Sequence, residues 1–237
     1  MVGAPGVGKS TVLDALASQW DATAAWALDP QHPAGGPWGK VGGLVPRGAY
    51  ERAHPEFAAL LFRALARANL EHPDERAARM GERAAALRRV FAKLEHAAER
   101  LGSVSVLVLD EGFLKHASAL LDERYSGEPL ARTLRRPQMP VGYVFADCAA
   151  EQAAGRIAGR GKQARSHLGF DPDEVMRLTR RSVDYWRRVA DRVEAARLPV
   201  LRLDTASSPE RNAHRIAGFA DEVGAAGQAH PGLRSQA

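Results

Sequence analysis

Near the N-terminus, eight consecutive residues have the types and the spacing of a loop that binds phosphate groups. Residues 3–10 read GAPGVGKS and satisfy the pattern G-x-x-x-x-G-K-[ST]. The glycines would let the backbone wrap around a phosphate, whose charge the loop amides and the positive end of the following helix would balance. We expect Lys9 to reach the β- and γ-phosphates of a nucleotide and the Ser10 hydroxyl to bind Mg²⁺. The predicted nucleotide contacts are Gly3, Ala4, Pro5, Gly6, Val7, Gly8, Lys9, Ser10 and Thr11, and the alternative is a glycine-rich turn without a ligand.

A second candidate is the acidic pair that ends an apolar run. Residues 106–111 read VLVLDE, which places Asp110 at the end of an expected strand. In phosphate-binding-loop proteins a carboxylate at this point holds Mg²⁺ through water, and we expect this role for Asp110. Glu111 has three possible roles: polarising an attacking water, orienting an acceptor group, or none beyond that of a surface glutamate.

A third candidate is a basic segment, GRIAGRGKQARSH, at residues 155–167. Arg156 and Arg160 are four residues apart, so they would share one face of a helix, and Lys162 and Arg165 follow. Cations placed over a nucleotide would offset the charge on a phosphoryl group during its transfer. The alternative is a solvated basic helix, which is also our interpretation of the later arginines Arg180, Arg181, Arg187 and Arg188.

A parallel sheet would bring these segments together. Apolar runs predict strands at residues 22–28, 104–109, 141–146 and 199–203, and helical patterns separate them. Helices are expected at 10–19, from Pro55 to about residue 70, and from Pro73 to Gly102. Two later helices have their start signals at 171–174 (DPDE) and at 208–209 (SP). Strands that alternate with crossover helices form parallel sheets, and residues 225–237 have no periodicity and are predicted to be a disordered tail.

Composition narrows the class of protein. The chain has 237 residues, 45% of them apolar, which is enough for one domain with a core. The net charge of +5 is modest, and a small polyanion such as ATP would explain it as well as nucleic acid would. One cysteine, Cys148, excludes an internal disulfide, and the apolar run at 104–109 is too short to cross a bilayer. We expect a cytoplasmic protein without a membrane partner.

With these motifs, the chain resembles the P-loop kinases of the nucleoside monophosphate kinase type, which include adenylate and thymidylate kinase-like proteins. The resemblance covers GAPGVGKS, VLVLDEG, VGYVFADC followed by GRIAGRGKQAR, and LPVLRLD. It implies an α/β fold, the three-layer P-loop NTPase fold, with helices on both faces of a parallel sheet in the order 2-3-1-4-5. It also implies ATP and Mg²⁺ as cofactors, a single domain over residues 1–224, an acceptor side at 29–50 and an arginine-bearing lid at about 156–170.

The chain departs from that family at two places. Thymidylate kinases usually carry an aspartate-arginine pair after the middle strand, whereas Glu111 and Gly112 follow Asp110 here. Their acceptor-binding segment has no clear counterpart in LDPQHPAGGPW. The candidate contacts for the unidentified small acceptor are Asp29, Trp38, Arg47 and Tyr50, and the alternative for each is a loop residue without a role. The first strand would be central in the sheet, yet only two residues precede Gly3. We therefore expect the natural start several codons upstream, with Met1 internal or mis-assigned.

Three functions fit the sequence. The leading one transfers the γ-phosphoryl group of ATP to a small acceptor, with Lys9, Asp110, Glu111, Arg156 and Arg160 as catalytic residues. The second is an ATPase or nucleotide-dependent switch that acts on a protein partner. The least favoured is a kinase for nucleic-acid ends, because no cluster of aromatic residues accompanies the arginines at 155–167. There is no LSGGQ-like signature and no N-K-x-D guanine motif, which favours adenine nucleotides. The sequence leaves the oligomeric state open.

Overall fold

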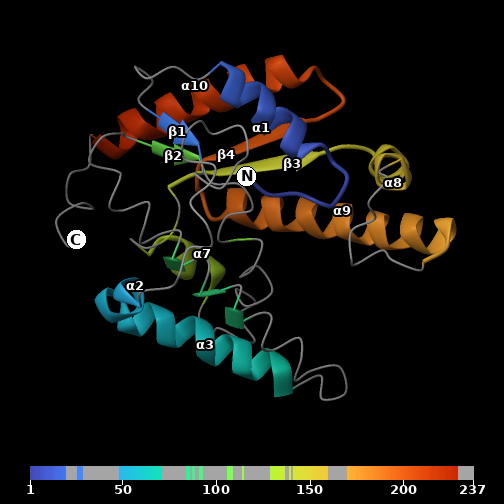
Figure 1. Cartoon of the computed structure of the whole chain (residues 1–237). Coiled ribbons are helices and arrows are strands. Elements are labelled where there is room, and N and C mark those ends of the chain that lie inside the picture. The colour runs from blue at the N-terminus through green and yellow to red at the C-terminus, as the bar shows by residue number, and fades with distance from the viewer. Residues whose placement is uncertain are drawn as a thin grey trace.

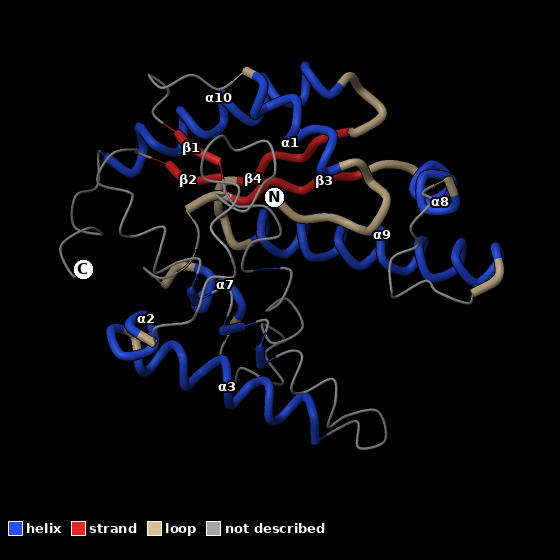
Figure 2. Tube along the Cα trace, in the orientation of Figure 1, coloured by secondary structure: helices blue, strands red, loops and turns tan. Residues whose placement is uncertain are grey.

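The computed structural model describes residues 1–19, 26–28, 48–70, 84–85, 87–88, 91–92, 106–108, 114, 129–136, 139, 141–159 and 170–228. The strands in this part of the chain are β1 (Trp26–Leu28), β2 (Val106–Val108), β3 (Tyr143–Asp147) and β4 (Val200–Asp204). The helices in the same part are α1 (Lys9–Ser18), α2 (Ala49–Ala53), α3 (Pro55–Leu70), α7 (Leu130–Leu134), α8 (Ala150–Ala158), α9 (Pro172–Ala195) and α10 (Pro209–Gln228). Figures 1 and 2 show their arrangement.

The described strands form two parallel pairs. β1 pairs with β2, and β3 pairs with β4, as expected for strands joined by crossover connections. Val2 adds a parallel bridge to Phe145 on the other edge of β3. If residues 1–2 count as the first strand, these adjacencies are 2-3 and 1-4-5. The predicted order also needs the first strand beside β2, and no such pairing occurs among the described residues. The complete sheet therefore stays a prediction.

Alternate side chains of β3 enter two hydrophobic cores on opposite faces of the strand. Val144 and Ala146 pack into the core that includes Leu13 of α1 and Ile216 of α10. The other core contains Tyr143 and Phe145 together with buried side chains from α3, α7 and α9, namely Phe57, Leu61, Leu134 and Val193. Figure 1 agrees, because α1 and α10 lie on one side of the strands and α9 lies on the other. A strand covered on both faces explains why the VGYVFA run has no polar alternation.

The helix start signals are confirmed. The Asp171 carboxylate accepts a hydrogen bond from the Glu174 amide at 2.8 Å, with Pro172 in the first turn of α9. The Ser208 hydroxyl accepts one from the Arg211 amide at 3.2 Å, ahead of Pro209 in α10.

The other end of α10 differs from the prediction. Residues 225–228 are helical because the alanine-rich segment continues the helix, and only 229–237 of the predicted tail lie outside the described residues.

The end of α9 forms a hydrogen-bonded turn with a strained residue. The amides of Arg197 and Leu198 donate to the carbonyls of Glu194 and Val193, at 2.8 and 3.4 Å, which is the double bond pattern of a Schellman motif. The left-handed position in this motif usually holds glycine, but here Arg197 occupies it with φ 57°. At the C-terminus of α9, the Cβ of Arg197 therefore makes the left-handed backbone conformation sterically unfavourable.

We expect Arg197→Gly to raise the free energy of unfolding by about 0.5–1 kcal/mol, because glycine adopts the left-handed conformation without a steric cost. Chemical denaturation of both proteins measures this difference. Arg197→Ala is the matched control, since it removes the exposed guanidinium but keeps a Cβ at the same φ. An equal gain in both variants would show that the side-chain charge, rather than the backbone conformation, destabilises the turn.

Candidate functional site

The predicted phosphate-binding loop lies between β3 and the start of α1. Val2 accompanies β3: its amide donates to the Val144 carbonyl at 2.9 Å, and its carbonyl accepts from the Ala146 amide at 2.8 Å. The chain then turns, and Gly8, with φ 90°, is the N-cap of α1. The loop thus ends at a helix N-terminus, where unpaired amides and the helix dipole favour an anion.

Two glycines allow the loop to pack closely on its neighbours. A Cβ on Gly3 would lie 2.4 Å from the Ala146 carbonyl oxygen of β3. A Cβ on Gly6 would lie 2.4 Å from the Ala153 carbonyl oxygen of α8, and Gly6 also has a left-handed φ of 81°. Because both acceptor atoms belong to the backbone, a side chain at either position would force the loop or its neighbour to move. Gly3 and Gly6 therefore allow the loop to pack closely against β3 and α8.

Lys9 is folded over its own loop. Its Nζ donates to the carbonyls of Gly3 and Ala4, at 3.0 and 3.2 Å. Ala4 and Val7 are buried, whereas Ser10 and Thr11 are exposed on the first turn of α1. The ammonium, the loop amides and the Ser10 hydroxyl thus belong to one short segment. Residues of these types at a helix start fit the phosphates of a nucleotide and the metal ion that accompanies them.

Arg156 has different partners from those expected of a lid arginine. Its Nη1 donates to the Val7 carbonyl at 3.1 Å, and its Nη2 donates to the Thr205 carbonyl at 3.2 Å. Its Nη1 also lies 3.5 Å from the Thr205 hydroxyl. Arg156 therefore joins the loop to the turn after β4, and its predicted contact with a transferring phosphoryl group stays a prediction. Asp110, Glu111 and Arg160 lie outside the described residues, as do 160–169 of the predicted lid.

The turn after β4 is itself fixed to β3. The amide and the hydroxyl of Thr205 both donate to the Asp147 carbonyl, at 2.9 and 3.0 Å. The buried Asn212 of α10 donates from Nδ2 to the Asp204 carbonyl at 2.9 Å. Thr205 was not among the predicted site residues. The position of this residue just after a predicted strand was the available signal, because the carboxyl ends of parallel strands meet at one edge.

Ion pairs hold α9 against the same edge of the sheet. Arg187 Nε lies 2.8 Å from Asp147 Oδ2, and this hydrogen bond raises the pKa of the guanidinium. Arg180 of α9 pairs with Glu151 of α8 at 2.9 Å. Both arginines are exposed, as predicted, but they also bind carboxylates of β3 and α8.

Cys148 is buried beside this edge, and burial raises the pKa of its thiol, so the group is neutral near pH 7.

The acceptor side is only partly described. Of its candidates, Tyr50 is a core residue: it is 8% exposed and stacks on Phe91 with ring centroids 5.2 Å apart. Burial also raises the pKa of the Tyr50 hydroxyl. Asp29, Trp38 and Arg47 lie outside the described residues. Tyr50 of α2 therefore packs in the core with side chains of α3 instead of making a surface contact.

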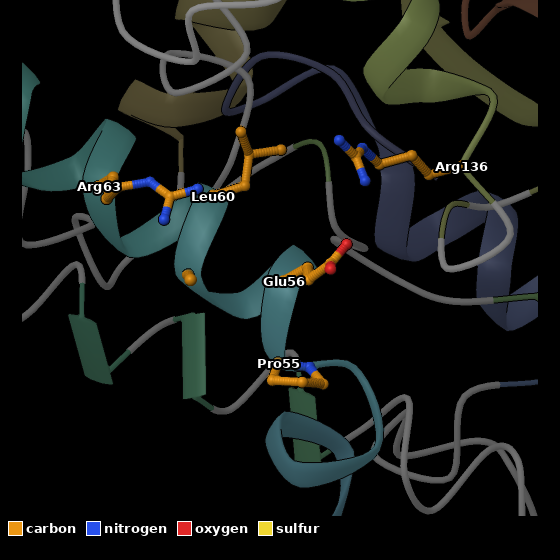
Figure 3. A pocket seen from close by; sticks show the side chains of 6 residues that line it. Pro55, Glu56, Leu60, Arg63 and Arg136 are labelled. Atoms are coloured by element: carbon orange, nitrogen blue, oxygen red, sulfur yellow. The ribbon is translucent and has the colours of Figure 1, made fainter.

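A separate open pocket of about 520 Å³ lies on α3. Figure 3 shows charged groups of Glu56, Arg63 and Arg136 around it, and its other lining residues are Pro55, Ala59 and Leu60. None of the loop residues lines this pocket. Glu56 and Arg63 are exposed, so the pocket is a surface depression with charged walls.

The described residues contain neither a membrane-spanning helix nor a cluster of metal-binding side chains. No helix there combines the length and the apolar character needed to cross a membrane. No group of three or more histidine, cysteine, aspartate and glutamate side chains in the same residues could hold a metal ion. Asp110, the carboxylate predicted to hold Mg²⁺ together with Ser10, lies outside the described residues.

In comparisons with known proteins, no family model and no curated protein matches the chain.

Proposed function

We propose that the chain is an ATP-dependent phosphotransferase with a P-loop NTPase fold, which moves the γ-phosphoryl group of ATP to a small acceptor. One observation carries the proposal: a loop with the pattern G-x-x-x-x-G-K-[ST] runs from the edge of β3 into the N-terminus of α1, closely packed through Gly3 and Gly6. This is the local arrangement in which that pattern binds phosphates. The parallel strand pairs and the helices on both faces of β3 support the fold part of the proposal.

The residues of the loop have distinct roles in this proposal. The backbone amides and the start of α1 bind the phosphates, and Lys9 exchanges its bonds with the Gly3 and Ala4 carbonyls for the β- and γ-phosphates. Ser10 and Asp110 hold Mg²⁺, which supplies the charge that neutralises the transferring group. Glu111 orients the acceptor or a water molecule, and Arg160 adds positive charge from the lid. The buried single cysteine agrees with a reducing compartment, so the proposal includes a cytoplasmic location.

The experiment follows the label of γ-labelled ATP. The protein is incubated with Mg²⁺ and labelled ATP, with and without a panel of nucleosides, nucleotides, sugars and short oligonucleotides, and the products are separated. We expect label on one small acceptor and little free phosphate in its absence. Release of phosphate at one rate with every acceptor would indicate the ATPase switch. Label on oligonucleotide ends would indicate the nucleic-acid kinase, and absence of both transfer and hydrolysis would contradict all three functions.

A further inference from the structure

Arg156 lies where three segments of the chain meet. It belongs to the last turn of α8, and its guanidinium reaches both the phosphate-binding loop and the turn after β4. Figure 1 shows the loop running from the N-terminus toward α8 before the chain enters α1. The partners of Arg156 are 149 and 49 residues away in sequence, at Val7 and Thr205. One side chain therefore hydrogen-bonds to two segments that are far apart in the sequence.

The loop already rests on α8 through its backbone. The Cα of Gly6 approaches α8 so closely that an added Cβ would lie 2.4 Å from the Ala153 carbonyl oxygen and 2.8 Å from Ile157 Cγ1. Val7, the next residue, is 1% exposed. Its carbonyl accepts from Arg156, so the peptide unit between Val7 and Gly8 is held from the α8 side. Fixing this carbonyl also fixes the direction of the Gly8 amide, because the two groups share one planar peptide unit.

The far end of the connection is equally well fixed. Arg156 donates to the Thr205 carbonyl, and the amide and hydroxyl of Thr205 donate to the Asp147 carbonyl of β3. The connection therefore runs from β3 through Thr205 and Arg156 to Val7. A guanidinium can span it because its planar donors point in several directions, whereas a lysine ammonium on a flexible stem cannot reproduce this geometry.

We propose that Arg156 is a positioning residue, which orients the Val7–Gly8 peptide unit by tying the loop to the turn after β4. The expected effect of Arg156 on nucleotide binding rests on the proposed phosphotransferase function. The positioning itself is a property of the protein without nucleotide. Arg156 acts on the loop backbone, so it affects ATP and ADP alike. A direct contact with the transferring group would instead affect ATP alone, because ADP has no γ-phosphate.

The first test measures ¹⁵N order parameters of Gly6, Val7 and Gly8 in the protein without nucleotide. In Arg156→Met we expect these values to fall from about 0.85 to below about 0.6, the range of flexible backbone. Arg156→Lys should behave like Arg156→Met, since positive charge alone does not restore the hydrogen bonds. Thr205→Val, which removes the hydroxyl but keeps the carbonyl, should give a smaller decrease. Unchanged order parameters in Arg156→Met would overturn the proposal.

Arg180→Met is the matched control, because Arg180 also binds α8, through Glu151, but does not touch the loop. It should leave the order parameters of the loop unchanged. An equal decrease in this control would show that any loosening of α8 disturbs the loop, which would also overturn a specific role for Arg156. Thermal unfolding of each variant shows whether the protein remains folded.

The second test measures the dissociation constants for ATP and ADP by calorimetry. We expect both to rise by about 10-fold in Arg156→Met, the factor that corresponds to loss of one charge-assisted hydrogen bond. A rise for ATP alone would overturn the proposal in favour of a phosphoryl contact. If the wild-type protein binds neither nucleotide, the proposed function fails, and the order parameters still decide the role of Arg156.

Discussion

Gly6→Ala is expected to weaken ATP binding by at least about 100-fold. The new Cβ would meet the Ala153 carbonyl oxygen at 2.4 Å, and alanine at φ 81° is strained as well. The Ala153 carbonyl belongs to the backbone of α8, so it cannot rotate away as a side chain would. The loop must move instead, and its amides would then lose their common direction toward a phosphate.

Calorimetric titration with ATP and chemical denaturation measure the two effects of this substitution. The strain should also lower the free energy of unfolding by about 1–3 kcal/mol. Gly155→Ala is the control, because Gly155 lies in α8 close to the same contact but an added Cβ there meets nothing within 4 Å. It should leave ATP binding unchanged and stabilise the helix by about 0.5–1 kcal/mol. Normal ATP affinity in Gly6→Ala would mean that the loop does not bind the phosphates.

Local signals in the sequence were sufficient for much of the fold. The Asp171–Pro172–Glu174 arrangement fixes the start of α9, since the cap is made within three residues of the chain. Pro55 and the pattern that follows it gave α3 with the bounds later observed. Leu87 and Phe91 are four residues apart in the helix predicted after Pro73, so they would share one face, and they are 1% and 2% exposed. In each case, the information lies within a few turns of helix.

Contacts between distant segments could not be predicted in the same way. The partners of Arg156 depend on how α8 and the turn after β4 meet the loop, which no spacing in the sequence encodes. Tyr50 illustrates a different limit. An aromatic residue in an irregular segment suits a ligand contact, but its large ring also gains by burial, and here it packs on Phe91. Burial of a single side chain is decided by tertiary packing.

Lys9→Ala is expected to reduce phosphoryl transfer by about 100- to 1,000-fold, the effect of removing one group that stabilises charge in a transition state. In the structure, the ammonium bonds the Gly3 and Ala4 carbonyls, so Lys9 closes the loop on itself. Binding of ATP would replace these two neutral acceptors by phosphate oxygens, which form stronger, charge-assisted bonds. The loop therefore keeps its ammonium next to the place where the substrate charge is expected.

The same variant separates the catalytic role of Lys9 from its role within the loop. Removing two half-buried hydrogen bonds should lower the free energy of unfolding by about 1–2 kcal/mol, which leaves the protein folded while transfer is nearly lost. Label transfer from γ-labelled ATP and chemical denaturation measure the two quantities. Arg211→Met, which removes an exposed positive charge from α10, controls for the change in net charge and should retain full activity. If Lys9→Ala keeps full transfer activity, the ammonium does not act on the phosphates, and the loop at residues 3–10 would be a structural turn between β3 and α1.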